Sequence, residues 1–114
     1  MERVGFYLGK KKIYTEAKKV RGINKGIGLI FRTKNTNNLL FEFKTMSKVA
    51  ITSVFVFFPF LAIWLDSKKK VVDVNVVRPF TLSILPKKEA KYLLEIPNNL
   101  KNLKLLNSIL KFYK

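Results

Sequence analysis

The chain contains neither cysteine nor histidine, and these two absences exclude several kinds of chemistry. Without them there can be no disulfide, no thiol nucleophile, no zinc site of the Cys/His kind and no imidazole acid–base catalyst. An enzyme built from this chain would have to work with carboxylates, lysines or tyrosines alone. We therefore lean toward a protein that is not an enzyme, and we expect no metal and no other cofactor.

Acidic residues are also scarce. Seven of them face 23 lysines and arginines, which gives a formal net charge of +16. The basic residues are mostly lysine, whereas base and phosphate contacts in nucleic-acid sites more often use arginine. The charge therefore has two open interpretations, a solvated surface or a surface that binds an anion.

The length and composition predict one globular domain covering residues 1–114. Hydrophobic residues make up 48% of the 114 residues, and a chain of this size can bury one sizeable core. The amino terminus has an early acidic residue and no apolar run of signal-peptide length. We therefore expect a cytoplasmic protein.

The most apolar part of the chain is residues 49–65, which carry no charge. A membrane helix is a poor interpretation, because the run is at the short limit for crossing a bilayer and Pro59 interrupts it. Val, Ile, Thr, Phe and Trp dominate it, and these residues favour strands. We expect two buried strands, at about 50–58 and 60–65, and no transmembrane segment.

Short alternating segments separated by turn residues make up most of the remaining chain. They predict an all-β domain, mainly antiparallel, forming a compact sandwich or barrel-like structure with one or two short helical turns. The expected strands are 4–8, 13–20, 39–43, 71–77 and 80–85, with 89–96 open to strand or helix.

Two of these segments carry specific expectations about side-chain direction. In 71–77 the valines at 72, 74 and 76 share one face and Asp73 points to solvent, while in 80–85 Phe80, Leu82 and Ile84 point inward. The tail 100–113 remains open. Its leucines have helical spacing, but a helical turn followed by a strand at 109–113 fits as well.

Several sequence blocks together resemble one known family. GLIFR at 28–32, LLFEF at 39–43, FFP at 57–59 with IWLD at 63–66, and YLLEIP at 92–97 resemble, in order and spacing, the domain of unknown function 192 family. The resemblance covers about residues 20–113.

The resemblance implies a compact β domain without an established activity, and a final strand at Ile109–Tyr113. The chain departs from the family at Phe55, Val56 and Leu61, where that family commonly has polar residues. A polar site that other members hold there would be lost here, or a more apolar core replaces it.

Paired carboxylates are candidate catalytic groups, because two of them can carry out hydrolysis. We expect Asp66 to serve a turn, whereas Glu42 and Glu95 lie in apolar strands, where a charge usually has a partner. We predict one of two ion pairs, Arg32–Glu95 or Arg78–Glu42, as a staple at the edge of the core.

Three lysine clusters, 10–12, 68–70 and 87–88, fall in predicted turns, and turns gather at the ends of a sandwich. Our first hypothesis is a basic domain, not an enzyme, that binds a polyanion such as RNA or DNA through these lysines. The alternative is that the lysines are charges that only keep turns and edges soluble. The candidate binding residues are Arg32, Arg78, Lys68, Lys69, Lys70, Lys87 and Lys88.

A second hypothesis is a β-sandwich that binds a small ligand or a protein beside the glycine-rich segment 21–32, because binding sites often lie on loops held by a rigid scaffold. The spacing of Gly22, Gly26 and Gly28 matches no phosphate-binding loop. We expect the aromatic residues between 55 and 64 to pack in the core rather than to stack on bases, because no basic residue interrupts them.

Overall fold

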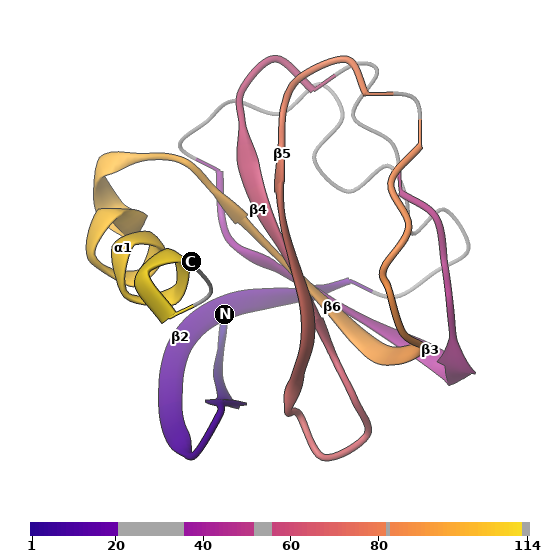
Figure 1. Ribbon diagram of the computed structural model, residues 1–114. Coiled ribbons are helices and arrows are strands. Elements are labelled where there is room, and N and C mark those ends of the chain that lie inside the picture. The colour runs from indigo at the N-terminus through magenta and orange to yellow at the C-terminus, as the bar shows by residue number, and fades with distance from the viewer. Residues whose placement is uncertain (21–35, 52–55, 82, 113–114) are drawn as a thin grey trace.

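The computed structural model describes residues 1–20, 36–51, 56–81 and 83–112. Six strands form one mixed sheet that curls into a half-barrel, and one short helix follows at the carboxyl end (Figure 1). This architecture confirms the prediction of a mainly β domain. The strands are β1 (Glu2–Leu8), β2 (Lys11–Val20), β3 (Leu39–Ser47), β4 (Phe60–Leu65), β5 (Val71–Val77) and β6 (Ala90–Pro97).

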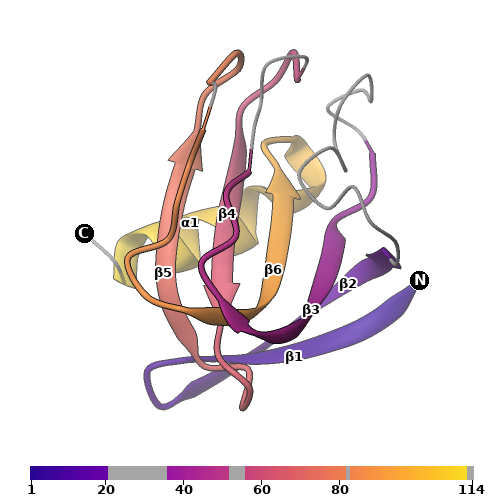
Figure 2. The same cartoon turned by 90° about the vertical axis from the view of Figure 1, so that its right-hand side faces the viewer.

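The strand order is β1-β2-β3-β6-β4-β5 (Figure 2). All neighbouring strands are antiparallel except β2 and β3, which run parallel with Lys18 opposite Leu39. Every residue of β4 is buried, as predicted for 60–65, because β4 lies between β6 and β5 and both faces of the sheet are covered.

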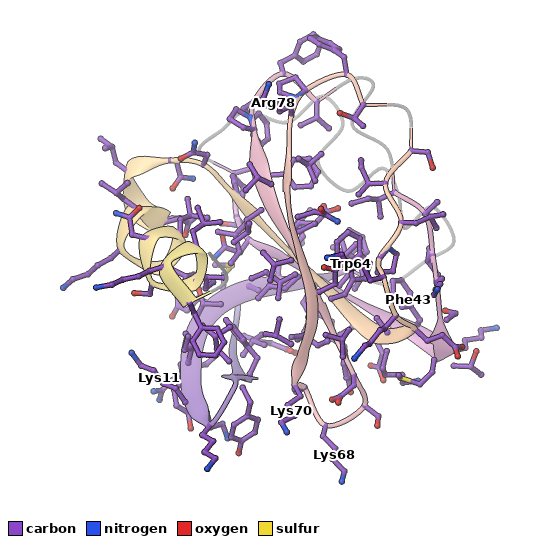
Figure 3. The ribbon with its side chains drawn as sticks, in the orientation of Figure 1. Lys11, Phe43, Trp64, Lys68, Lys70 and Arg78 are labelled. Carbon is purple, nitrogen blue, oxygen red and sulfur yellow. The ribbon has the colours of Figure 1, made fainter. Side chains whose placement is uncertain are left out.

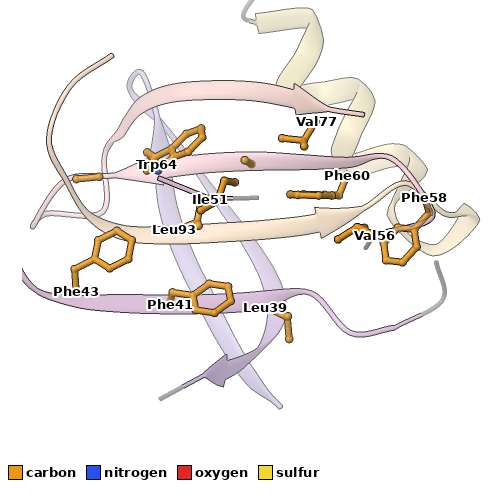
Figure 4. Packing of buried hydrophobic residues seen from close by; sticks show 12 residues of the cluster. Leu39, Phe41, Phe43, Ile51, Val56, Phe58, Phe60, Trp64, Val77 and Leu93 are labelled. Carbon is orange, nitrogen blue, oxygen red and sulfur yellow. The ribbon is translucent and has the colours of Figure 1, made fainter. Parts of the chain in front are cut away.

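Each face of the sheet has its own apolar core. Trp64 and Phe43 lie on one face (Figure 3), together with Phe41, Phe60 and Leu93 of the neighbouring strands (Figure 4). This face is covered by Ile51, Val56 and Phe58 from the segment before β4. The other face carries Leu61, Ile63 and Ile96, and it is covered by Phe6 of β1 and by Leu106 and Ile109 of the helix.

The two ends of the strand order meet at one point, and this contact gives the half-barrel its curvature. Tyr7 near the end of β1 forms an isolated parallel bridge with Lys70 just before β5. The next turn requires a glycine, because Gly9 has φ of 63° and an added Cβ would lie 2.8 Å from the ring of Phe112. The β1–β2 turn therefore packs directly against the end of the helix.

The tail is a helix, so the strand that the family resemblance implied at Ile109–Tyr113 is wrong over its described residues. A 3₁₀ turn, η2 (Leu100–Asn102), leads into α1 (Leu103–Phe112). The Asn99 side chain caps η2 by accepting from the backbone N–H of Asn102. Burying Leu106 and Ile109 on the sheet favours the helix over an added strand.

Two expected strands are not formed as predicted. In the described part of 50–58, regular pairing is limited to the bridge between Ile51 and Ile84. The segment 80–85 is also not a strand. Phe80 was expected to point inward, but it has φ of 63° and is 59% exposed, because Arg78 and Pro79 turn the chain out of the sheet. Phe55 and Leu82 lie outside the described residues.

Candidate functional site

Two hairpin turns far apart in sequence lie together at one end of the molecule. The backbone N–H of Tyr7 donates a 2.8 Å hydrogen bond to the carbonyl oxygen of Lys69, which joins the β1–β2 hairpin to the β4–β5 loop. We call the resulting surface the basic end, and Figure 3 shows Lys11, Lys68 and Lys70 projecting from it. The basic end consists of Lys10, Lys11, Lys12, Lys68, Lys69 and Lys70.

Asp66 shapes the β4–β5 loop, as predicted. Its Oδ1 accepts hydrogen bonds of 2.9 Å from the backbone N–H groups of Lys68 and Lys70. Lys69 has φ of 62°, the left-handed conformation that lets the loop turn back toward β1. The carboxylate is thus used to order the loop, and the ammonium groups of Lys68 and Lys70 project into solvent.

Tyrosine rings lie between the cations of this end. The Nζ of Lys12 lies 5.2 Å from the ring centre of Tyr7 and 5.3 Å from that of Tyr14, and the guanidinium of Arg3 lies 4.2 Å from the Tyr14 ring. Lys69 stands in the same way 5.4 Å from the Tyr92 ring. These are cation–π distances, and both Tyr7 and Tyr14 are exposed.

The strand pairing explains how Tyr14 comes to lie flat on this surface. Gly5 is the cross-strand partner of Tyr14, and an added Cβ there would be 2.9 Å from the Tyr14 ring and 2.9 Å from the Lys12 side chain. Gly5 therefore leaves the space in which the ring and the lysine meet.

The charge of the basic end is not neutralised within the described part of the chain, where no ion pair involves its six lysines. The side-chain hydrogen bond to Tyr14, and then the charges of Tyr14 and Tyr7, raise the pKa of Lys12 above its ordinary value. The Lys12 ammonium therefore stays charged well above neutral pH.

The other candidate binding residues are placed elsewhere. Arg78 is exposed at the opposite end of the molecule (Figure 3), beyond β5 and near the edge-to-face ring pair Phe57–Phe80. Lys87 and Lys88 are exposed in the loop before β6. Arg32 and the whole segment 21–32 lie outside the described residues.

The prediction that Asp73 faces solvent is wrong. Asp73 is buried, and its carboxylate is satisfied within the fold. It accepts hydrogen bonds of 2.9 Å from the N–H of Val74 and 2.8 Å from the N–H of Lys87. The carboxylate ties the loop before β6 to β5, a structural use that satisfies its charge with backbone donors.

The predicted Arg78–Glu42 pair is not formed, and the alternative pair Arg32–Glu95 lies outside the described residues because Arg32 does. Glu42 is exposed and pairs with Lys19 at 3.3 Å and Lys91 at 4.0 Å instead of the predicted Arg78. Glu95 is only 2% exposed, and its Oε1 has no hydrogen-bond partner among the described residues. Burial raises the pKa of Glu95 to about 8, so this carboxyl group is largely protonated at neutral pH.

The sequence reasoning missed Arg3, Tyr7 and Tyr14 as parts of the basic end. Alternation along 2–8 and 11–20 places these residues on the exposed face of each strand. Only the β1–β2 register puts Tyr14 opposite Gly5 and brings two cations, Arg3 and Lys12, to the two rings.

An apolar pocket of about 240 Å³ lies where α1 meets the beginning of β4 and the end of β5. Leu103, Leu106 and Leu110 of the helix line it, together with Pro59 and Val76. It touches the strand after Pro59, as the ligand-binding hypothesis expected, but the other half of that expected site lies outside the described residues.

A family model described as an uncharacterized ACR, domain of unknown function 192, matches residues 16–105. The chain belongs to this family. A UPF0127 protein of Pyrococcus abyssi (strain GE5 / Orsay) is 37% identical over 78 residues. That match covers 68% of this chain and 59% of the relative's length.

Two solved structures share the fold of this member of the domain of unknown function 192 family. A protein of unknown function from Novosphingobium aromaticivorans has a TM-score of 0.74 at 16% identity, covering 90% of this chain and 76% of its own. A protein from Sinorhizobium meliloti, described provisionally as a transcription regulator, has a TM-score of 0.72 at 16% identity, covering 92% and 83%.

No helix in the described parts of the chain has the length and apolarity needed to cross a bilayer. The apolar run considered as a membrane helix instead supplies strand β4 over Phe60–Leu65 and buried side chains that cover one face of the sheet.

Proposed function

We propose that this protein binds the phosphate backbone of a nucleic acid at the basic end and that it favours single strands. The observation that carries the proposal is the 2.8 Å hydrogen bond from Tyr7 to Lys69, because it brings two lysine-rich turns together around exposed tyrosine rings. Lysines contact phosphates without regard to sequence, and exposed rings stack on unpaired bases.

The arrangement of rings supports single strands over duplexes. Tyr14 is 49% exposed, with the Arg3 guanidinium over its ring and the Lys12 ammonium nearby, so one surface offers an aromatic ring together with cations for the flanking phosphates. A base inside a duplex has both faces covered by its neighbours, so the tyrosine would add nothing to duplex binding.

The test is fluorescence anisotropy of the full chain with a labelled single-stranded RNA and a labelled duplex DNA over a series of salt concentrations. We expect binding to the single strand that weakens linearly on a log–log plot against salt. No binding at low salt, or equal binding to both probes, would contradict the proposal.

A charge-matched pair of variants locates the site. The triple variant Lys11→Gln, Lys68→Gln, Lys70→Gln removes three positive charges from the basic end, and Lys44→Gln, Lys101→Gln, Lys104→Gln removes three exposed charges elsewhere. If all three basic-end lysines contact phosphates, the first variant lowers the salt slope for single-stranded RNA by about 2. Equal losses in both variants would mean that only the net charge matters.

The contribution of the ring is tested by Tyr14→Leu, which keeps the local charge. We expect a loss of about fivefold or more in affinity for the single strand, and no change for duplex DNA. Heparin serves as a polyanion without bases, and its affinity should not respond to Tyr14→Leu.

A further inference from the structure

Three connections of the chain meet at the end of the molecule opposite the basic end, where Figure 3 shows Arg78. Phe60 at the start of β4 pairs with Val77 at the end of β5 and with Pro97 at the end of β6. The segments that precede β4 and follow β5 and β6 therefore lie side by side. We call the surface that they form the apolar end, and it comprises residues 56–60, 77–81 and 97–104.

Each of these three segments carries a large apolar side chain that is more than half exposed. These side chains are Phe57 at 61%, Phe80 at 59% and Leu100 at 89%. The rings of Phe57 and Phe80 pack edge to face, with their centroids 5.4 Å apart. A single exposed apolar residue is ordinary, but a group of them on adjoining segments indicates a surface that meets an apolar partner.

The backbone of Phe80 is strained while its ring lies in solvent. Phe80 has φ of 63°, and among the described residues Lys69 is the other non-glycine residue with a positive φ. This conformation is unfavourable for a bulky side chain, and such strain is concentrated at functional positions. The ring is thus held outward against the preference of its own backbone, which supports a binding role for the apolar end.

The charge of the apolar end decides the kind of partner. The sequence contains no aspartate or glutamate in 43–65, 74–88 or 96–114, the stretches that supply this end. Its cations are Arg78, Lys101 and Lys104, and all three are exposed. Apolar side chains accompanied by cations suit the interface of an anionic bilayer, where the apolar groups enter the acyl boundary and the cations meet the headgroups. The net charge of +16 adds to the attraction.

We infer that the apolar end docks this protein on the surface of an anionic lipid bilayer, with Phe57, Phe80 and Leu100 inserted at the level of the headgroups. Three side chains reach only the interface, so the contact is peripheral and reversible. The inference does not depend on the proposed function, because the basic end lies at the other end of β4 and β5 and stays accessible when the apolar end is docked.

Cosedimentation of the full chain with vesicles of phosphatidylcholine and about 30% phosphatidylserine tests the docking. We expect the native chain to bind, and the double variant Phe57→Ser, Phe80→Ser to lose about tenfold or more in affinity. The control Met46→Ser, Leu85→Ser removes two exposed apolar side chains elsewhere and should lose less than about twofold. No binding by the native chain, or equal losses in the two double variants, would overturn the inference.

Binding to single-stranded RNA should not respond to Phe57→Ser, Phe80→Ser, so this inference and the proposed function can fail separately. Both rings are exposed, so we expect the thermal unfolding transition of this variant to stay cooperative. Sedimentation velocity covers the other occupant. Self-association of the native chain that these two substitutions abolish, without vesicle binding, would assign the apolar end to a second copy and overturn the inference.

The absence of native cysteine allows a test of orientation that keeps both phenylalanines. Leu100→Cys places an environment-sensitive fluorophore at the apolar end, and Lys11→Cys places it at the basic end. We expect the same vesicles to shift the emission from position 100 to shorter wavelength and to leave position 11 unchanged. Nitroxide-labelled lipid should quench the fluorophore at position 100 alone. A shift at position 11, with or without one at position 100, would show adsorption through the lysine turns and would overturn the inference.

Discussion

The side-chain amide of Asn102 donates a 2.9 Å hydrogen bond to Oδ1 of Asn38, and both residues are buried. Asn102 also donates to the carbonyl oxygen of Pro97, while Asn38 donates to Thr15 Oγ1 and to the carbonyl oxygen of Glu16. This network joins β2, the start of β3, the end of β6 and the turn that leads into α1. The two asparagines therefore set where the helix begins on the sheet.

Asn102→Ala should destabilise the protein by about 2 kcal/mol, because it leaves a buried Asn38 oxygen and a carbonyl without a donor. Urea unfolding followed by far-UV circular dichroism measures the change. Asn107→Ala changes an exposed asparagine in the same region, and we expect its effect to stay within about 0.5 kcal/mol. Equal effects of the two variants would mean that the network contributes little.

The buried Glu95 predicts a pH-dependent stability. Its pKa is raised by burial from 4.5 in the unfolded chain to about 8 in the fold, so the folded state binds more protons between these values. The free energy of unfolding should therefore fall as pH rises from about 5 to about 8 and then level off, for a total on the order of 4 kcal/mol.

Glu95→Gln removes this titration and keeps the shape of the side chain. Urea unfolding at pH 5, 7 and 9 should show the variant gaining stability relative to the native chain at each step. If the free energy of unfolding changes with pH in the same way in both proteins, ionisation of Glu95 does not destabilise the fold.

Gly9→Ala should destabilise the protein by about 1–3 kcal/mol, because the residue has a positive φ and its Cβ would enter the space of the Phe112 ring. The double variant Gly9→Ala, Phe112→Ala separates the two causes by thermal unfolding. If the clash dominates, Gly9→Ala should cost little stability when Phe112 is already alanine. If the backbone strain dominates, Gly9→Ala should cost as much stability in Phe112→Ala as in the native chain.

Asp66→Ala tests whether loop order or local charge controls the basic end. Removal of one negative charge alone would strengthen polyanion binding. We expect the opposite, a loss of about threefold, because Lys68 and Lys70 lose the carboxylate that orders their backbone. Anisotropy with single-stranded RNA measures this loss of affinity. Asp66→Asn retains one side-chain acceptor, so its affinity should lie between those of the native chain and Asp66→Ala.

Much of the β architecture could be predicted from local patterns. Alternation identified 71–77, the apolar run at 60–65 identified a strand buried on both faces, and the family blocks identified the family. The errors fall where tertiary contacts outweighed local preference. Phe80 was expected in the core, but it is exposed after the turn at Pro79. Residues 109–112 were expected as a strand, but they form part of a helix that covers an apolar face of the sheet.

For the candidate site, the sequence alone determined the number of charged residues and the positions of the turns that carry them. The absence of cysteine and histidine, the net charge of +16 and the lysines at 10–12 and 68–70 follow from the chain alone. Only the tertiary structure decided that these two turns meet, that Arg78 lies at the other end, and that Asp73 and Glu95 are buried. The physical reason is that strand order and sheet curvature depend on contacts between residues distant in sequence. A pattern read along the chain shows which residues can form a surface, and the register between strands decides which of them share one.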